Sequence, residues 1–234
     1  MGSSMFTFKK FTVCQEQCAM KVGTDGVLLG AWANGGKEIL DIGTGTGLIA
    51  LMMAQRFTGA HIDAVEIDHD AAEQAKQNVE ASPFADRIQV MQTPIQRYPT
   101  IRKYASIVSN PPFFVDALLA PDARRTTARH STALTYSDLF TAVKSLLSSD
   151  GEFSAIIPAE CLTAFTSQAY LAGLSMTRRC AVRTTPRKVP KRYLLAFMHA
   201  NTSHDMEITE ECIQYADGSR TDWYTRLTAD FYIK

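Results

Sequence analysis

The sequence predicts an α/β fold built on a doubly wound, mostly parallel sheet that closes with an antiparallel hairpin. Two observations carry the prediction. From residue 39 onwards, short apolar runs alternate with segments of helical length, the pattern of parallel strands joined by crossover helices. A glycine-rich turn follows the first apolar run, at the place where open α/β sheets bind ligands. The chain has 234 residues, 46% of them hydrophobic, which suits one large domain.

The expected elements follow in chain order. Short apolar or β-rich runs predict strands at residues 39–43, 61–66, 87–92, 104–109 and 152–157. Segments of helical length predict helices at residues 46–57, 69–81, 136–148 and 159–172. Pro158 suits the start of the last helix and Gly173 its end. Two further β-rich runs, 175–184 and 193–200, predict the closing hairpin with a basic loop between them.

Composition limits the protein class. The formal net charge is zero, so net charge alone predicts no nucleic-acid partner. The five cysteines form no CxxC pair and no His or Cys cluster completes a metal site, so we expect reduced thiols, no metal and a cytoplasmic location. No apolar run approaches the ~18 residues of a membrane span. We expect one main domain at residues 35–234, preceded by an N-terminal extension at 1–34.

The glycine-rich turn reads D-I-G-T-G-T-G from Asp41 to Gly47. A strand, glycines and a helix in this order place backbone N–H groups and a helix N-terminus beside a ligand. Glu66 ends the next strand, where its carboxylate suits the two hydroxyls of a ribose. A GxG alone also fits a tight strand-to-helix turn. The strand context, Asp41 and Glu66 together favour a nucleoside cofactor.

The glycine spacing departs from the dinucleotide fingerprint GxGxxG, because the third glycine comes one place early. The form D-x-G-x-G-x-G resembles motif I of the class I S-adenosylmethionine (AdoMet) methyltransferases, over most of residues 35–200. The resemblance implies a Rossmann-like sheet of seven strands with an antiparallel last pair. It also implies that Glu66, with Ile67 beside it, holds the ribose. The residues that it places against the methionine end are Asp41, Gly43, Thr44, Gly45 and Gly47.

The segment after the third strand departs from the family pattern. Many relatives carry an acid there that receives the amino group of the cofactor's adenine. This chain reads Met91-Gln92-Thr93-Pro94, so Thr93 or Gln92 is the expected acceptor.

Asn110-Pro111-Pro112-Phe113 follows the fourth strand. It resembles the (N/D)PP(Y/F/W) motif of methyltransferases that act on an amino group conjugated to a π-system. The lone pair of such a nitrogen is delocalised. Acceptors at the Asn110 side chain and the Pro111 carbonyl can aim the lone pair at a sulfonium methyl and stabilise the nitrogen as it becomes tetrahedral. Pro112 limits the backbone and Phe113 offers a stacking face. The alternative is a Pro-Pro turn beside core phenylalanines.

Two classes of enzyme share this motif, those that methylate adenine N6 and those that methylate a glutamine amide of release factors. Charge placement favours RNA, because residues 175–204 contain no acid. The expected phosphate contacts are Arg124, Arg125, Arg129, Arg187, Lys188, Lys191 and Arg192. A solvated basic face is the alternative for these residues.

The N-terminal stretch Lys9–Trp32, the NPPFF segment and the C-terminal DFYIK closely resemble the bacterial family of tRNA1(Val) adenine-N6 methyltransferases, over nearly the whole chain. This family modifies the adenosine 3′ of the anticodon. The resemblance implies that residues 1–34 pack over the cofactor, with Thr24 and Asp25 as contacts. The alternative for either residue is the N-cap of a helix at 26–33, and both roles can hold at once. A glutamine-amide methyltransferase, a non-catalytic RNA-binding module and a nicotinamide oxidoreductase remain the alternatives.

Overall fold

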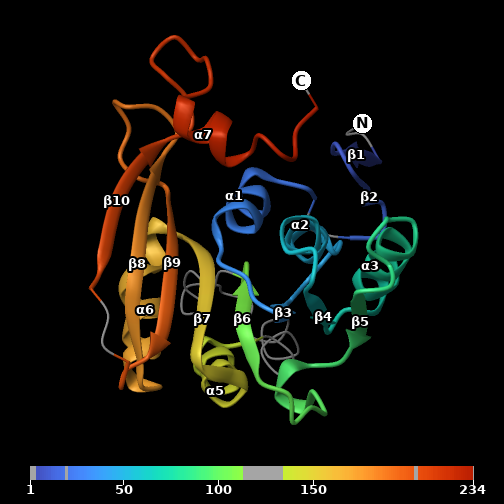
Figure 1. Cartoon of the computed structure of the whole chain (residues 1–234). Helices are drawn as coiled ribbons and strands as arrows, with labels where there is room; N and C mark the ends of the chain where they lie inside the picture. Colours follow the sequence, from blue (N-terminus) through green and yellow to red (C-terminus); the bar gives the residue numbers. More distant parts are fainter. Residues whose placement is uncertain (1–3, 19–20, 113–133, 203–204, 234) are drawn as a thin grey trace, which may run out of the picture.

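The computed structural model describes residues 4–18, 21–112, 134–202 and 205–233. Its centre is an eight-stranded sheet in the order β10-β8-β9-β7-β6-β3-β4-β5 (Figure 1). Five neighbouring strands run parallel, and their bounds are β3 (Glu38–Ile42), β4 (His61–Glu66), β5 (Ile88–Gln92), β6 (Tyr104–Ser109) and β7 (Leu147–Pro158). The predicted α/β class with a mostly parallel sheet is therefore confirmed.

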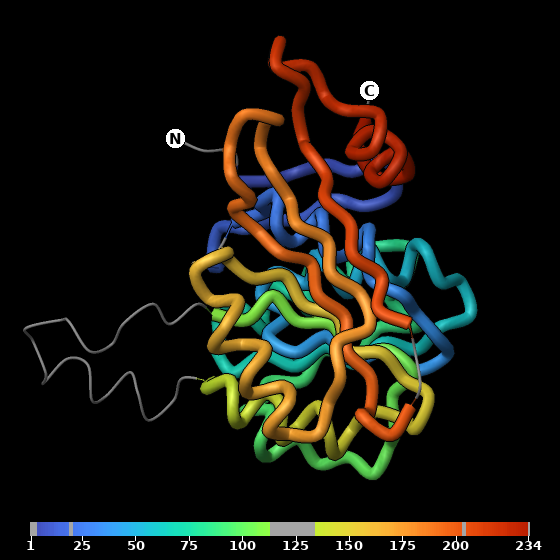
Figure 2. Tube along the Cα trace, turned by 90° about the vertical axis from the view of Figure 1, so that its left-hand side faces the viewer, coloured from blue at the N-terminus to red at the C-terminus, as the bar shows by residue number. Residues whose placement is uncertain are grey.

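The closing hairpin is also confirmed. The strand β9 (Arg192–His199) lies antiparallel between β7 and β8 (Leu174–Arg183). The predicted count of seven strands is wrong, because β10 (Glu207–Cys212) adds an eighth, parallel to β8. In Figure 2 the three strands run side by side at one edge of the sheet. β10 reads E-I-T-E-E-C and none of its residues is buried, so it lacks the apolar run that marks a core strand.

Helices cover both faces of the sheet. On one face lie α1 (Thr24–Trp32), α2 (Leu48–Arg56) and α3 (His69–Glu80), and on the other lie α5 (Tyr136–Leu146) and α6 (Leu162–Leu171). The predicted helix 159–172 differs at its start, because Ala159–Cys161 form a separate 3-10 turn. Strand β7 begins five residues before the predicted residue 152, directly after α5, because residues 147–151 continue the extended backbone.

Helix α1 packs closely on α2 through two glycines. A Cβ on Gly30 would lie 2.8 Å from the sulfur of Met52, and one on Gly26 would lie 2.9 Å from a methyl carbon of Leu48. The two glycines thus let the helices approach closely and bring the N-terminus of α1 to the ligand edge of the sheet. The sequence carries no local signal that predicts this packing of α1 on α2.

The chain ends pack together. A hairpin of β1 (Met5–Thr7) and β2 (Thr12–Cys14) lies near the segment that follows α7 (Asp222–Leu227). The Lys9 amide donates to the Phe231 carbonyl at 2.8 Å, and Phe8 stacks on Tyr232. These contacts join the N-terminal hairpin to the C-terminal segment, and the division at residue 34 stays a prediction.

Within the described ranges, no helix combines the length and apolar character needed to cross a membrane. The same ranges hold no group of three or more His, Cys, Asp or Glu side chains arranged to bind a metal ion.

Candidate active site

The glycine loop joins β3 to α2 at the carboxyl edge of the sheet. Gly43, Gly45 and Gly47 have φ values of 72°, 57° and 81°, the left-handed region that residues with a side chain rarely adopt. The Gly43 and Thr44 amides donate to the Val65 carbonyl at 2.8 and 3.1 Å, which holds the loop against the end of β4. The conformation therefore requires the glycines, and it turns the loop backbone toward the ligand edge.

Asp41 lies at the base of this loop with no solvent exposure. Its Oδ2 accepts hydrogen bonds from Thr44 Oγ1 at 2.6 Å and from the Ala50 amide at 3.2 Å. Its Oδ1 is buried and has no partner among the described residues. Burial raises the pKa of Asp41 to about 7, and the bonds from Thr44 and Ala50 only partly oppose that rise. A buried carboxylate oxygen without a donor fits a cationic ligand such as an α-ammonium group.

Glu66 ends β4 and ties the glycine loop in place. Its Oε2 accepts from the Gly45 amide at 2.9 Å, and its Oε1 accepts from the Ile67 and Asp68 amides at 2.8 and 3.0 Å. A carboxylate has about four acceptor sites, so capacity remains for a ligand hydroxyl. The sequence predicts a ligand role for Glu66 but carries no local signal for these hydrogen bonds to the loop.

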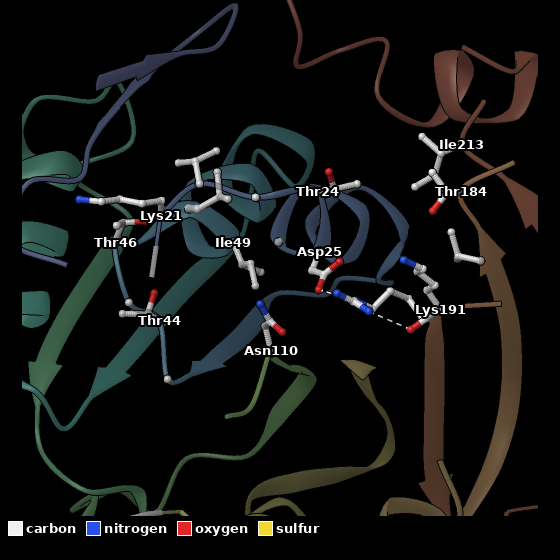
Figure 3. Close-up of a pocket in the computed structure, with 18 of the residues that line it drawn as sticks. Lys21, Thr24, Asp25, Thr44, Thr46, Ile49, Asn110, Thr184, Lys191 and Ile213 are labelled. Atoms are coloured by element: carbon white, nitrogen blue, oxygen red, sulfur yellow. Dashed lines mark hydrogen bonds and ion pairs between the residues drawn. The ribbon is translucent and has the colours of Figure 1, made fainter. Parts of the chain in front are cut away.

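Two cavities open at this edge. The larger, of about 840 Å³, is lined by Glu66, Ile67 and Thr93 among others. The smaller, of about 640 Å³, lies beside the N-terminus of α1 (Figure 3). Gly43, Gly45 and Asn110 line both cavities, so the side chain that follows β6 stands where the two meet.

The Asn110 segment is held by the sheet beneath it. Ser109 Oγ donates to the Ile42 carbonyl at 2.8 Å, which joins the end of β6 to the end of β3. Pro111 is buried, whereas Pro112 is exposed and lines the larger cavity. Phe113, predicted as the stacking face, lies outside the described residues.

The structure distinguishes the two residues predicted to accept a hydrogen bond from the adenine amino group. Thr93 lines the larger cavity, and its amide donates to the Glu66 carbonyl at 2.9 Å. The side-chain oxygen of Gln92 lies 3.2 Å from the His69 ring nitrogen and does not line the cavity. The geometry therefore favours Thr93 over Gln92.

The alternative helix-cap role of Thr24 and Asp25 is wrong. Gly23 occupies the N-cap of α1, which begins at Thr24, and within the described residues no side chain caps it. Both residues line the smaller cavity. Asp25 Oδ2 instead accepts from Arg192 Nε at 2.7 Å, so α1 and β9 are joined by an ion pair (Figure 3).

The basic window of residues 175–204 carries less free charge than its composition suggests. Arg178 pairs with Glu152, Arg183 with Glu210, and Arg192 with Asp25. The acids come from other parts of the chain, which is why the count within the window missed them. The remaining predicted loop cations are all exposed: Arg187, Lys188 and Lys191. The other predicted RNA contacts, Arg124, Arg125 and Arg129, lie outside the described residues.

Several residues that line the cavities were not predicted from the sequence. In the smaller cavity these are Lys21, Thr46, Thr184 and Gln214, and in the larger they are Glu16, Gln17 and Cys18. Lys21 belongs to the same K-V-G-T-D segment as Thr24 and Asp25, so the resemblance that predicts those two residues could also have indicated Lys21. Thr184 and Gln214 come from the ends of β8 and β10 and carry no local signal.

Affinity for a ligand with an ammonium group should fall below about pH 7, because the Asp41 carboxylate is then protonated. The dissociation constant should rise about tenfold per pH unit below that pKa, measured by calorimetry from pH 5.5 to 8.5.

The raised pKa of Asp41 also means that the folded ligand-free protein binds more protons than the unfolded chain between about pH 4 and 7. Its stability should therefore fall as pH rises through that window. Asp41→Asn should remove both trends, and an unchanged pH profile would contradict the assignment.

Residues 21–161 match the methyltransferase small domain family. The tRNA1(Val) (adenine(37)-N6)-methyltransferase of Bacteroides thetaiotaomicron is 46% identical, over 100% of this chain and 99% of its own length. The enzyme of the same name from Bacteroides fragilis is 44% identical, over the full length of both chains. Among solved structures, a predicted O-methyltransferase from Agrobacterium tumefaciens superposes with a TM-score of 0.69 and 16% identity, covering 88% of this chain and 96% of its own, which supports the fold. The chain belongs to the methyltransferase small domain family and, within it, to the family of tRNA1(Val) (adenine(37)-N6)-methyltransferases.

Proposed function

We propose that the protein transfers a methyl group from AdoMet to the N6 nitrogen of an adenine in tRNA, the adenosine just 3′ of the anticodon in tRNA1(Val). One observation of the structure carries the proposal. Asn110 lines both cavities, so a single side chain can contact the target amine and lie close to the methyl donor. The names of the relatives, which match over the whole chain, supply the substrate.

The residues of the larger cavity fit the adenosine part of AdoMet. Glu66 offers its remaining acceptor capacity to the ribose, with Ile67 beside it, and Thr93 stands at the adenine end. The backbone of the glycine loop, which lines both cavities, suits the methionine end, and the unpartnered oxygen of Asp41 is buried at the base of this loop. When bound, AdoMet supplies an electrophilic methyl group on a sulfonium.

The Asn110 side-chain oxygen and the Pro111 carbonyl act on the substrate amine. Hydrogen bonds from N6 to these acceptors direct its lone pair toward the methyl group and stabilise the positive charge that develops on nitrogen. The N–C bond forms as the C–S bond breaks, and the methylated nitrogen then loses a proton to solvent. No strong general base is needed, because the cationic nitrogen is acidic.

The substrate class can be tested by offering the protein two acceptors with radiolabelled AdoMet. Label should enter bulk tRNA from cells that lack this modification, and a purified release factor should stay unlabelled. Label in the release factor alone would favour glutamine-amide methylation. Absence of label from both, with AdoMet bound, would favour a non-catalytic module. We also propose, from the tRNA substrate, that the protein works in the cytoplasm.

The tip of the β8–β9 loop should provide part of the attraction for tRNA. Arg187 and Lys188 are exposed, and a turn bond from the Lys188 amide to the Thr185 carbonyl at 3.1 Å shapes the loop. Changing both residues to Gln should weaken tRNA binding and reduce the slope of log affinity against log salt by about 1.5 units, because two phosphate contacts are lost. Filter binding between 50 and 300 mM salt measures this.

The matched control for this loop variant is Lys37→Gln with Lys103→Gln, which removes two exposed charges that directly precede the amino ends of β3 and β6. The control should leave the salt slope unchanged, and AdoMet affinity should be equal in all three proteins. Equal slopes for wild type and the loop variant would show that the loop is only a solvated surface.

A further inference from the structure

The two cavities differ in charge. Among the described residues that line the larger cavity, every charged side chain is acidic: Glu16, Glu66, Asp68 and Asp70. The described lining of the smaller cavity carries three cations, Lys21, Lys191 and Arg192, and a single acid, Asp25, which Arg192 already binds. The cavities meet at Asn110, so a phosphate that accompanies a base to this residue is repelled on one side and attracted on the other.

Lys191 is the cation of this cavity that is best placed to meet an anion. The described part of the chain brings no carboxylate within 4.0 Å of its ammonium group. Lys21 differs, because its ammonium donates to the Gln15 carbonyl. In the view of Figure 3, Lys191 lies between Asp25 and Thr184 on the cavity wall.

The backbone of Lys191 is fixed on three sides. Its amide donates to the Val182 carbonyl at 3.0 Å, and its carbonyl accepts from the Ala159 amide at 3.1 Å. The same carbonyl accepts from Arg192 Nη1 at 2.9 Å, and Arg192 is itself held by Asp25. A side chain on so constrained a backbone loses less freedom on binding than one at the loop tip.

We propose that Lys191 binds the phosphate adjoining the target adenosine, so that the smaller cavity is the nucleotide subsite beside Asn110. The proposal rests on the proposed function and assigns a separate role to one residue of the basic loop. Arg187 and Lys188 line neither cavity and attract tRNA at a distance, whereas Lys191 makes a contact at the target nucleotide.

The test combines a protein change with a substrate change. Two tRNA1(Val) molecules are assembled by ligation, each with one neutral methylphosphonate, either 5′ or 3′ of the target adenosine. For the wild type, one of the two should lower kcat/KM roughly tenfold or more, since a charge-assisted hydrogen bond is lost. Lys191→Gln should lower kcat/KM by a similar factor on native tRNA and show almost no further loss on that modified tRNA.

Lys188→Gln is the matched control, since it removes a charge from the same loop outside the cavity. Lys188→Gln should lower kcat/KM by the same factor on native and on modified tRNA, so the effects of the protein change and the substrate change multiply. AdoMet affinity of Lys191→Gln, measured by calorimetry, should equal that of wild type.

Three results would overturn the proposal. The first is that neither methylphosphonate affects the wild type, and the second is that the losses multiply in Lys191→Gln as they do in Lys188→Gln. The third is a weakened AdoMet affinity in Lys191→Gln, which would assign its anion to the carboxylate of the cofactor. Failure of the proposed function is distinguishable, because wild type would then leave native tRNA unmethylated.

Discussion

Asn110→Ala is expected to lower kcat by about 100-fold or more and to leave AdoMet affinity within about twofold of wild type. Removal of one acceptor that acts mainly in the transition state typically costs this much. The Asn110 side chain lies at the junction of the two cavities, whereas the contacts proposed for AdoMet come mostly from Glu66 and the glycine loop. Single-turnover methylation of tRNA, with calorimetry of AdoMet, separates the two effects.

Asn110→Asp provides the matched control, since a carboxylate keeps the acceptor and the side-chain size. It should retain clearly more activity than Asn110→Ala at pH 7.5. If Asn110→Ala methylates tRNA at a near-normal rate, Asn110 has no part in the chemistry. If the variant loses AdoMet binding to the same degree as activity, its role lies in the cofactor site.

Glu66→Ala is expected to weaken AdoMet binding on the order of 100-fold. The structure leaves the carboxylate capacity for one ribose hydroxyl, and a charge-assisted hydrogen bond of this kind contributes roughly 1.5–3 kcal/mol. The structure adds a second reason for a loss, because Glu66 also accepts from the Gly45, Ile67 and Asp68 amides. Removal of the carboxylate leaves these donors without a partner and frees the glycine loop.

Two measurements separate the ribose contact from the bracing of the loop. Wild type should bind S-adenosylhomocysteine more tightly than its 2′-deoxy analogue, and Glu66→Ala should bind the two nearly equally. The melting temperature of the ligand-free variant reports the loss of bracing. Equal discrimination between the two ligands by wild type and variant would contradict the ribose assignment, whatever happens to the melting temperature.

The sequence predicted the parts of the fold that have strong local signals. The apolar runs of β3, β4 and β6 and the left-handed glycines of the loop are encoded locally, and the predicted bounds differ from the observed ones by at most one residue. β10 was missed because a polar edge strand owes its structure to pairing with β8.

In the candidate site, too, residues with a local sequence signal were predicted and partners that depend on tertiary structure were not. Asp41, Glu66 and Asn110 stand at strand ends, so motif spacing was enough to bring them together. The Asp25–Arg192 ion pair joins residues 167 positions apart, and the pairing of Arg178 with Glu152 joins two different strands. Such partners depend on the assembled sheet, which composition and spacing do not describe.

Nucleoside analysis of tRNA1(Val) after incubation with the protein and AdoMet tests the central claim most directly. The account predicts that mass spectrometry of the digested tRNA finds N6-methyladenosine, confined to the fragment with the adenosine 3′ of the anticodon. A transcript with guanosine at that position should gain no methyl group, and Asn110→Ala should yield almost none in the same time. A methyl group on another atom or another nucleotide, or none on tRNA while AdoMet binds normally, would contradict the account.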